Sequence, residues 1–311
     1  MYSLIIYIIM FRRHPEKQYL SLIKHIIKNG ERELGRNGYT KSIIGANMRF
    51  SLNDNKIPFI TTKKLAWKSC LKELLWFING ETDNTILQKQ GVKIWNDNAS
   101  KEFLQSRNLF NYEENDLGPI YGYQWRNFNK HYTNKTKHNR DKQISKFIGK
   151  GKNIDQLQNI IDKINDPKKR SSRRLIMTAW NPCQLDQMAL PPCHIVSQFH
   201  ILGGRLSCSM YQRSGDVGLG IPFNIASYSF LTRLIAHHCG LEPGEFIHYI
   251  GNAHIYEEHE EALEKQLLRT PRDFPKCFIH KKYFDIENYK FEDFVIKDYD
   301  HHSKIDMKMI A

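Results

Sequence analysis

The spacing of apolar side chains separates helical from extended segments. Five segments carry apolar residues at helical spacing and predict helices: 16–29, 67–78, 153–164, 225–239 and 255–269. Eight segments alternate apolar and polar residues or form short apolar runs, and predict extended pieces: 42–52, 57–62, 175–180, 194–202, 205–213, 245–250, 278–284 and 305–310. Gly203-Gly204 predicts a hairpin turn between two of them.

The order of these segments indicates the fold class. Strands and helices are interleaved without a regular strand–helix–strand repeat, and the chain has no glycine pattern of dinucleotide-binding or P-loop folds. With 41% hydrophobic and 25% charged residues, a chain of 311 residues can build one large core without disulfides or metal. We predict a single α+β domain with a mixed, mostly antiparallel sheet flanked by helices.

The charge balance favours phosphate-bearing partners. The chain has 46 Lys and Arg against 33 Asp and Glu, a net charge of +13. The basic insertion, residues 130–152, holds eight of the cations and one acid, and therefore +7 of the total. It is interpreted as a solvated loop, with weak RNA or DNA contact as the alternative.

The N-terminal segment and the cysteines indicate the cellular location. Residues 1–14 form an apolar extension too short to span a bilayer, without the basic start or cleavage site of a secretory signal. The six cysteines lack the spacing of a zinc site or a disulfide framework. We therefore expect reduced thiols, a cytoplasmic location and no metal, with the extension set apart from a single domain over 15–311.

Cys193 is the first candidate nucleophile. Pro191 and Pro192 stiffen the chain before it, so its sulfur is expected at a fixed position. His194 follows directly, but adjacent residues of an extended chain point in opposite directions, so it is not expected to serve as the base of a Cys–His pair. Taken alone, this segment more often marks a buried structural thiol.

Residues 211–224 add groups that suit a nucleotide. Arg213 and Ser214 match the oxygens of a phosphate, and Arg213 beside Cys193 would favour the thiolate. Asn224 carries an amide donor and acceptor and can read an imide edge such as that of uracil. The alternative is a Gly-rich loop with polar capping residues.

Further candidates each have an ordinary structural explanation. Arg173 and Arg174 offer two charges, or a solvated connection; His254 and Tyr256 could donate to a sugar hydroxyl, or be satisfied core residues. Glu73 on an apolar helix predicts a raised pKa suited to proton transfer, unless it faces solvent.

Three more side chains suit a flat ligand such as a pterin. Tyr121, Trp95 and Asn98 provide a phenol, an aromatic face and an amide. A packed core would suit the tryptophan equally well.

Six motifs, in one order, resemble the thymidylate synthase family. They are Glu73-Leu-Leu-Trp-Phe77, Leu117-Gly-Pro-Ile-Tyr-Gly-Tyr-Gln-Trp-Arg126, Pro191-Pro-Cys-His194, Gln212-Arg-Ser-Gly-Asp216, Gly220-Ile-Pro-Phe-Asn-Ile-Ala-Ser-Tyr228 and His254-Ile-Tyr256. The resemblance implies reductive methylation of dUMP to dTMP. The carbon and the hydride come from 5,10-methylenetetrahydrofolate, and dihydrofolate is the second product.

The resemblance also implies residue roles. The catalytic set is Cys193, which adds to C6 of the ring, with Glu73, Tyr121, His194, Arg213, Asp216 and Asn224. The dUMP set is Arg36, Arg173, Arg174, Gln212, Arg213, Ser214, Gly215, Asp216, Asn224, His254 and Tyr256. The folate set is Lys63, Trp95, Asn98, Asp216, Leu219, Phe223, Ile310 and Ala311. Arg173 and Arg174 are implied to reach the other subunit of a homodimer, with a face of the sheet at its interface.

The sequence departs from the family pattern in three places. The N-terminal phosphate loop is shorter, so either Arg36 or Arg32 is left as its ligand. Asn252 stands where an acid is usual, and two extra residues precede Arg173-Arg174.

Three other functions are alternatives to dUMP methylation. A deoxycytidylate hydroxymethylase of the same fold prefers an acid at position 224, so Asn224 favours uracil. A basic RNA-binding protein would use residues 130–152. A cysteine hydrolase using Cys193 and His194 lacks an orienting partner.

Overall fold

A six-stranded sheet organises the molecule. The computed structural model describes residues 14–133 and 153–310, so the N-terminal extension up to residue 13 and most of the basic insertion lie outside the described residues. The strand order is β1-β2-β6-β5-β4-β3, and every neighbouring pair is antiparallel except β5 and β6. The predicted mixed, mostly antiparallel sheet is confirmed.

The elements have the following bounds. The sheet contains β1 (Glu31–Gly35), β2 (Gly38–Ser51), β3 (Ile176–Thr178), β4 (His194–Leu202), β5 (Arg205–Asp216) and β6 (Glu242–Tyr256). A separate hairpin pairs β7 (Lys276–Ile279) with β8 (Phe294–Lys297). The α-helices are α2 (Lys17–Asn29), α3 (Trp67–Ile78), α4 (Asn84–Lys89), α5 (Lys101–Ser106), α6 (Tyr121–Asn127), α8 (Gln156–Asn165), α9 (Gly220–His238) and α10 (Glu260–Leu267).

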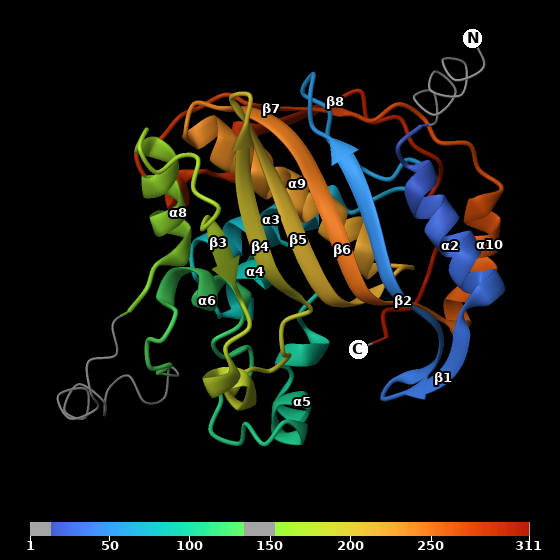
Figure 1. Ribbon diagram of the computed structural model, residues 1–311. Coiled ribbons are helices and arrows are strands. Elements are labelled where there is room, and N and C mark those ends of the chain that lie inside the picture. Colours follow the sequence, from blue (N-terminus) through green and yellow to red (C-terminus); the bar gives the residue numbers. More distant parts are fainter. Residues whose placement is uncertain (1–13, 134–152, 311) are drawn as a thin grey trace, which may run out of the picture.

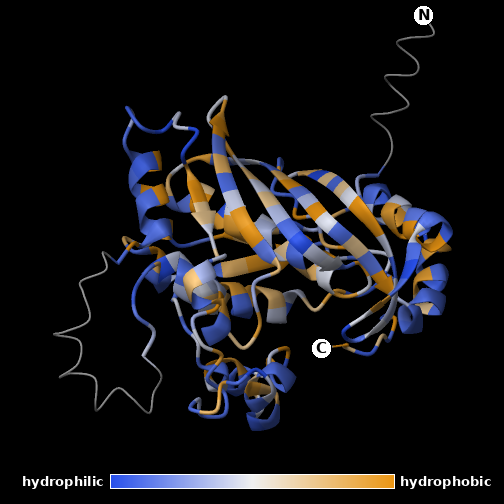
Figure 2. Ribbon diagram, turned by 60° about the horizontal axis from the view of Figure 1, so that its bottom comes forward, coloured by the Kyte–Doolittle hydropathy of each residue, from blue (hydrophilic) through white to orange (hydrophobic). Residues whose placement is uncertain are grey.

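One face of the sheet is covered by helices and the other is open. Figure 1 shows α9 and α3 behind β4, β5 and β6, with α2 and α10 beside the β2 edge. Apolar side chains of α9 such as Phe230 and Leu234 are fully buried, and burial of each contributes roughly 1.5–3 kcal/mol. Hydropathy alternates along the strands (Figure 2), as expected for a sheet with one face in the core.

The open face carries exposed apolar residues. Ile176, Tyr211 and Tyr249 are 47%, 45% and 43% exposed. Tyr211 and Tyr249 lie opposite each other in the β5–β6 register, whereas the neighbouring pair Met210 and His248 is buried. Side chains alternate between faces along a strand, so the exposed pair belongs to the uncovered side.

Several boundaries differ from the predictions. The helix predicted over 225–239 begins at Gly220, because Pro222 lies in its first turn, where backbone N–H groups have no intrahelical acceptor. The strand predicted over 245–250 continues to Tyr256, so the next helix starts only at Glu260. The segments 57–62 and 305–310, predicted as extended, belong to no strand.

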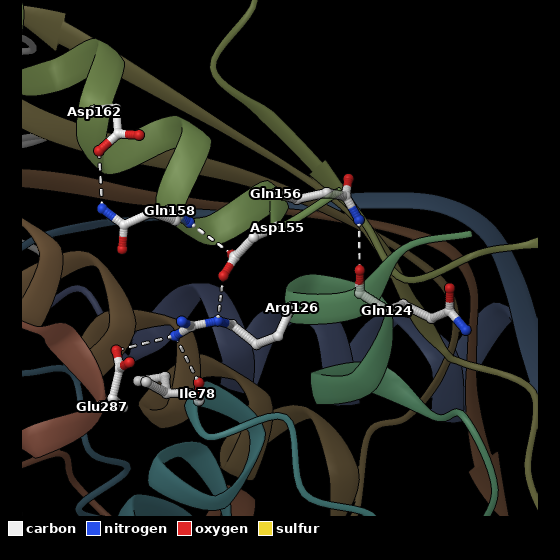
Figure 3. Close-up of polar contacts among 8 residues, drawn as sticks. All are labelled: Ile78, Gln124, Arg126, Asp155, Gln156, Gln158, Asp162 and Glu287. Atoms are coloured by element: carbon white, nitrogen blue, oxygen red, sulfur yellow. Dashed lines mark hydrogen bonds and ion pairs between the residues drawn. The ribbon is translucent and has the colours of Figure 1, made fainter. Parts of the chain in front are cut away.

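Arg126 connects α6 to α3 and α8 (Figure 3). Its guanidinium donates to the Asp155 carboxylate at 2.9 Å and to the Ile78 carbonyl at 3.0 Å, and lies 3.4 Å from Glu287. These contacts fix α6 against the end of α3 and the start of α8. Tyr121, at the other end of α6, is thereby held in place.

None of the helices in the described ranges combines the length and apolarity needed to cross a bilayer.

Candidate active site

A single large cavity gathers most of the predicted side chains. Its volume is about 1040 Å³, above the usual range of roughly 300–1,000 Å³ for a pocket that holds one drug-sized ligand. The wall draws on the β1–β2 turn, α3, β5, the start of α9, the end of β6 and the C-terminal segment. Such a cavity can hold two ligands side by side.

The backbone holds Cys193 at one place on this wall. Its N–H donates to the Tyr121 hydroxyl at 2.8 Å, and its carbonyl accepts from the Arg213 N–H at 2.8 Å. The β4–β5 pairing is irregular between His194 and Val196, directly after the cysteine. Such irregularities re-aim side chains next to active sites.

The Arg213 guanidinium lies beside the thiol. Its Nη2 is 3.7 Å from Sγ of Cys193, and it also donates to the carbonyls of Pro191 and Pro192 at 3.0 and 2.8 Å. Burial raises the pKa of Cys193, while Arg213, the Tyr121 hydroxyl and Arg36 act in the opposite direction. The predicted effect of Arg213 therefore has the expected sign, but burial outweighs it.

The β1–β2 turn places Arg36 on the cavity wall, whereas Arg32 is not among the described lining residues. Arg36 lies in the two-residue turn between the paired Gly35 and Gly38, and it lines the cavity together with Ser214. Arg32 instead forms an ion pair with Glu257 and lies over the Tyr39 ring. Arg36 is therefore the residue positioned to meet a ligand.

Arg173 and Arg174 lie elsewhere. Both are exposed just before β3, and neither is among the described lining residues. The two arginines therefore do not contribute to the described wall of this cavity.

A hydrogen-bonded relay fixes the orientation of the Asn224 amide. Gln212 Nε2 donates to the Ser214 carbonyl at 2.9 Å, and a carbonyl can only accept. The same nitrogen lies 3.0 Å from Oδ1 of Asn224. The contact with Gln212 therefore identifies Oδ1 as the acceptor, and Asn224 lines the cavity with its amide in this orientation.

His254 and Tyr256 lie together on the cavity wall, at the end of β6. Their ring centroids are 5.4 Å apart. Asn252 lies 3.0 Å from Nδ1 of His254 and so takes up the contact next to the predicted sugar site. Burial lowers the pKa of His254, although Asp216 opposes this.

The chain closely matches known proteins. The family model described as "Thymidylate synthase" matches residues 17–311. "Thymidylate synthase 1/2" of Encephalitozoon cuniculi is 49% identical over 96% of this chain and 98% of that protein. "Thymidylate synthase" of Homo sapiens is 50% identical over 95% of this chain and 91% of that protein. The "Putative bifunctional dihydrofolate reductase-thymidylate synthase" of Oryza sativa subsp. japonica is 49% identical, and this chain spans 58% of its length.

The chain belongs to the thymidylate synthase family. The resemblance found in the sequence is thereby confirmed. The family methylates dUMP to dTMP with methylenetetrahydrofolate as co-substrate, so this chain is a methyltransferase.

Glu73 lies in the thymidylate synthase cavity and does not face solvent. Its carboxylate accepts from Trp95 Nε1 at 2.7 Å. Burial raises the pKa of Glu73 to about 8, although the Trp95 hydrogen bond acts in the opposite direction. At neutral pH this carboxyl is mostly protonated, which prepares it to donate a proton.

His194 is part of a buried aromatic cluster. Its Nδ1 lies 2.8 Å from the Tyr228 hydroxyl, and its ring stacks on Tyr121 with centroids 4.2 Å apart. Burial, followed by His248, lowers its pKa to about 3. His194 therefore lines the cavity as a neutral imidazole.

The predicted folate residues line the same cavity. Those found on its wall are Lys63, Trp95, Asn98, Asp216, Leu219, Phe223 and Ile310, while Ala311 lies outside the described residues. Gly215 is not among the lining residues; a Cβ on it would clash with the Ile221 side chain, at 2.5 Å. Burial lowers the pKa of Lys63 to about 8, against the pull of Asp216.

Several lining residues were not predicted. They are Lys64, Ser69, Arg107, Leu190, Lys304 and Met307 among others. Lys64 could have been found from its neighbour Lys63, whereas Arg107 and Lys304 carry no motif. No cluster of three or more His, Cys, Asp or Glu side chains suited to a metal ion occurs within residues 14–133 and 153–310.

Proposed function

We propose that Cys193 is the nucleophile of the methylation of dUMP. Its sulfur adds to C6 of the uracil, and C5 becomes the nucleophile that attacks the one-carbon unit of methylenetetrahydrofolate. The observation that carries this proposal is that Cys193, Arg213 and Asn224 share one cavity wall. A stiff thiol beside a fixed cation suits a bound nucleotide.

Tyr121 and Glu73 are proposed to handle protons. The Tyr121 hydroxyl accepts from the Cys193 N–H, so it lies close to the ring carbons and can remove the C5 proton through a water. Glu73, with its pKa of about 8, can supply a proton to the network around the uracil oxygen, where negative charge develops. Loss of the C5 proton expels tetrahydrofolate and leaves an exocyclic methylene on C5. Tetrahydrofolate then gives its hydride to this carbon, the bond between C6 and the Cys193 sulfur breaks, and dTMP and dihydrofolate leave.

The Asn224 relay favours uracil over cytosine. The Nδ2 donor matches the O4 carbonyl of uracil, and Oδ1 can accept from N3–H. Cytosine would present an amine to Nδ2, so two donors would face each other. A flip of the Asn224 amide, which would remove this clash of donors, is opposed by the hydrogen bonds. The Ser214 carbonyl fixes the Gln212 amide, and the Gln212 amide fixes that of Asn224.

The two ends of the nucleotide and the folate are assigned by charge and shape. Arg36, Arg213 and Ser214 take the phosphate, and His254 with Tyr256 takes the ribose 3′-hydroxyl. The folate contacts Trp95, Asn98, Asp216, Lys63, Leu219, Phe223 and the C-terminal Ile310–Ala311 pair.

A homodimer is proposed to complete the phosphate site. Arg173 and Arg174 lie away from their own cavity, and the open sheet face carries exposed Ile176, Tyr211 and Tyr249. Pairing these faces between two copies would bury the apolar residues and bring the two arginines to the partner's cavity. Mixing an inactive Cys193→Ser chain with an inactive Arg173→Ala/Arg174→Ala chain should then restore up to about a quarter of wild-type activity, because one site of the mixed dimer is intact. No recovery, with mixed dimers verified by mass, would refute this arrangement.

The remaining assignments are coarser. We propose a catalytic domain over 15–311, preceded by the extension 1–14, in a cytoplasmic, reducing compartment. All six cysteines are free in the structure, which fits such a compartment. Weak RNA binding by residues 130–152 is a secondary proposal that loses affinity steeply with added salt.

The decisive test uses 5-fluorodeoxyuridylate with methylenetetrahydrofolate. Because fluorine cannot leave C5 as a proton does, the ternary complex should remain covalent and survive denaturation. Peptide mapping should locate the adduct at Cys193, and Cys193→Ser should give none. Labelling at exposed Cys183 instead, or faster turnover of dCMP than of dUMP, would contradict the proposal.

A further inference from the structure

A buried histidine lies behind the cavity, between Asp216 and the C-terminal segment. His259 ends the short 3-10 helix Glu257–His259, directly after the strand that carries His254 and Tyr256. Its side chain is 0% exposed. It lines no part of the cavity described above, and none of the steps proposed so far uses it.

One ring nitrogen holds the C-terminal segment. Nε2 of His259 lies 2.7 Å from the backbone carbonyl of Lys308. A carbonyl only accepts, so Nε2 is the donor. Lys308 stands between Met307 and Met309, which both line the cavity, so this bond holds that segment against the wall.

The other ring nitrogen faces Asp216. Nδ1 is buried without a hydrogen-bond partner and lies 3.8 Å from Oδ1 of Asp216, the nearest carboxylate oxygen. Asp216 itself accepts from the backbone N–H of Gly218 at 2.8 Å and of Leu219 at 3.3 Å, just before α9. The carboxylate is therefore held from the backbone on one side and approached by the imidazole on the other.

The packing around this contact is tight. A Cβ on Gly218 would lie 2.8 Å from Nδ1 of His259 and 3.3 Å from the Met307 sulfur. Lys63 donates to the Gly218 carbonyl from the opposite side. Asp216, Gly218, His259 and the C-terminal segment therefore pack directly against one another.

We propose that His259 is a positioning residue that couples co-substrate binding at Asp216 to the placement of the C-terminal segment. This rests on the proposed role of Asp216 as a folate ligand. When a ligand hydrogen-bonds to Asp216, the carboxylate fixes the orientation of the imidazole ring. The imidazole in turn fixes the position of the Lys308 carbonyl. The segment then covers the side of the cavity where the folate lies.

Three variants at position 259 separate the two contacts. His259→Gln places an amide donor near the position of Nε2 and keeps the bond to Lys308. His259→Asn places its amide near Nδ1 and keeps only the side facing Asp216. His259→Phe keeps the ring volume and removes both.

His238→Phe is the matched control. His238 is also buried with an unpartnered Nδ1, but it lies near the end of α9 and is not among the described cavity residues. It should leave both KM values within twofold of wild type.

Steady-state kinetics and limited proteolysis test the coupling. The Phe and Asn variants should raise KM for methylenetetrahydrofolate about tenfold or more, with KM for dUMP within twofold, and the Gln variant should recover most of the loss. Trypsin cleavage after Lys308, followed by mass spectrometry with dUMP and a non-reacting folate analogue, should be slowed by the ligands in wild type and Gln, but not in Phe or Asn.

Two results would overturn the proposal. One is a folded Phe variant with wild-type KM values and ligand-dependent protection of Lys308. The other is a fall in kcat and a rise in both KM values that are equal for Phe, Asn and Gln, which is the mark of a merely structural residue. The proteolysis requires no turnover, so it stands apart from the covalent-complex test of the proposed function.

Discussion

Glu16 provides the sharpest test of how the structure supports the cavity. It is completely buried before the first turn of α2, and its carboxylate accepts four hydrogen bonds. Oε2 accepts from the N–H and hydroxyl of Thr61 at 2.9 and 2.6 Å, and Oε1 accepts from the same groups of Thr62 at 2.9 and 2.6 Å. Lys63, on the cavity wall, is the next residue.

The magnitude follows from the donors that lose their acceptor. In Glu16→Gln one carboxylate oxygen becomes an NH₂ group, which faces one backbone N–H and one hydroxyl. The hydroxyl can turn, but the backbone N–H cannot, and an unsatisfied buried donor costs about 1–3 kcal/mol. Adding the weakening of the remaining bonds from charged to neutral, we expect a loss of about 2–4 kcal/mol in the free energy of unfolding.

Urea unfolding monitored by circular dichroism, at one fixed protein concentration, measures this loss. Glu245→Gln is the control, because Glu245 forms an ion pair with Arg49 in which the side chains are 38% and 58% exposed, and such pairs contribute about 1 kcal/mol or less. A Glu16→Gln variant within 0.5 kcal/mol of the control, roughly the usual scatter of surface substitutions, would show that the four bonds do not stabilise the fold as reasoned here.

Three further predictions test the site. Arg36→Ala should raise KM for dUMP by about 10- to 100-fold, the equivalent of roughly 1.5–3 kcal/mol for hydrogen bonds to a charged group. Arg32→Ala should change KM less than threefold. Similar effects of both variants would contradict the proposal that Arg36 binds the phosphate. Because the pKa of Glu73 is raised, its contribution to stability is fully present below the ordinary carboxyl pKa and is lost as pH rises through about 8. The free energy of unfolding should therefore fall between pH 5 and 8.5, and this fall should be smaller in Glu73→Gln. An unchanged slope would refute the raised pKa. Gly122→Ala should lower stability by about 1–3 kcal/mol or more in thermal unfolding, because its Cβ would lie 2.3 Å from the Phe77 carbonyl oxygen; a fully stable variant would be at odds with this packing.

Local patterns predicted the elements whose periodicity was strong. The helix over 67–78 and the strand over 194–202 match α3 and β4 at both ends. β1 was not predicted, because all five of its residues are exposed and none alternates between core and solvent. The short helices α4 and α5 were also missed; their starts are fixed by the caps Asp83 and Ser100, and six residues carry little helical periodicity.

The sequence predicted which residue types form the site. It could not predict which of them lie close together in the folded chain. The motifs pointed to Cys193, Arg213 and Asn224, which share the cavity. The choice between Arg36 and Arg32 needed the structure, because Arg32 lies within β1 whereas Arg36 lies in the turn that follows it. The contact between Asp216 and His259 could not be predicted, since it joins the end of β5 to the short 3-10 helix after β6, and only the pairing of these two strands brings them together.

The parallel pairing of β5 and β6 has a consequence for evolution of this enzyme. Ser214 lies opposite Asn252, and Asp216 opposite His254, so the side chains proposed to bind phosphate, sugar and co-substrate lie together at the ends of these two neighbouring strands. Inserting or deleting one residue in the middle of either strand would turn every later side chain to the other face. Such a change would disturb the buried face and turn all of these proposed ligand-binding groups away at once, whereas the register upstream already shifts between Leu206 and Cys208.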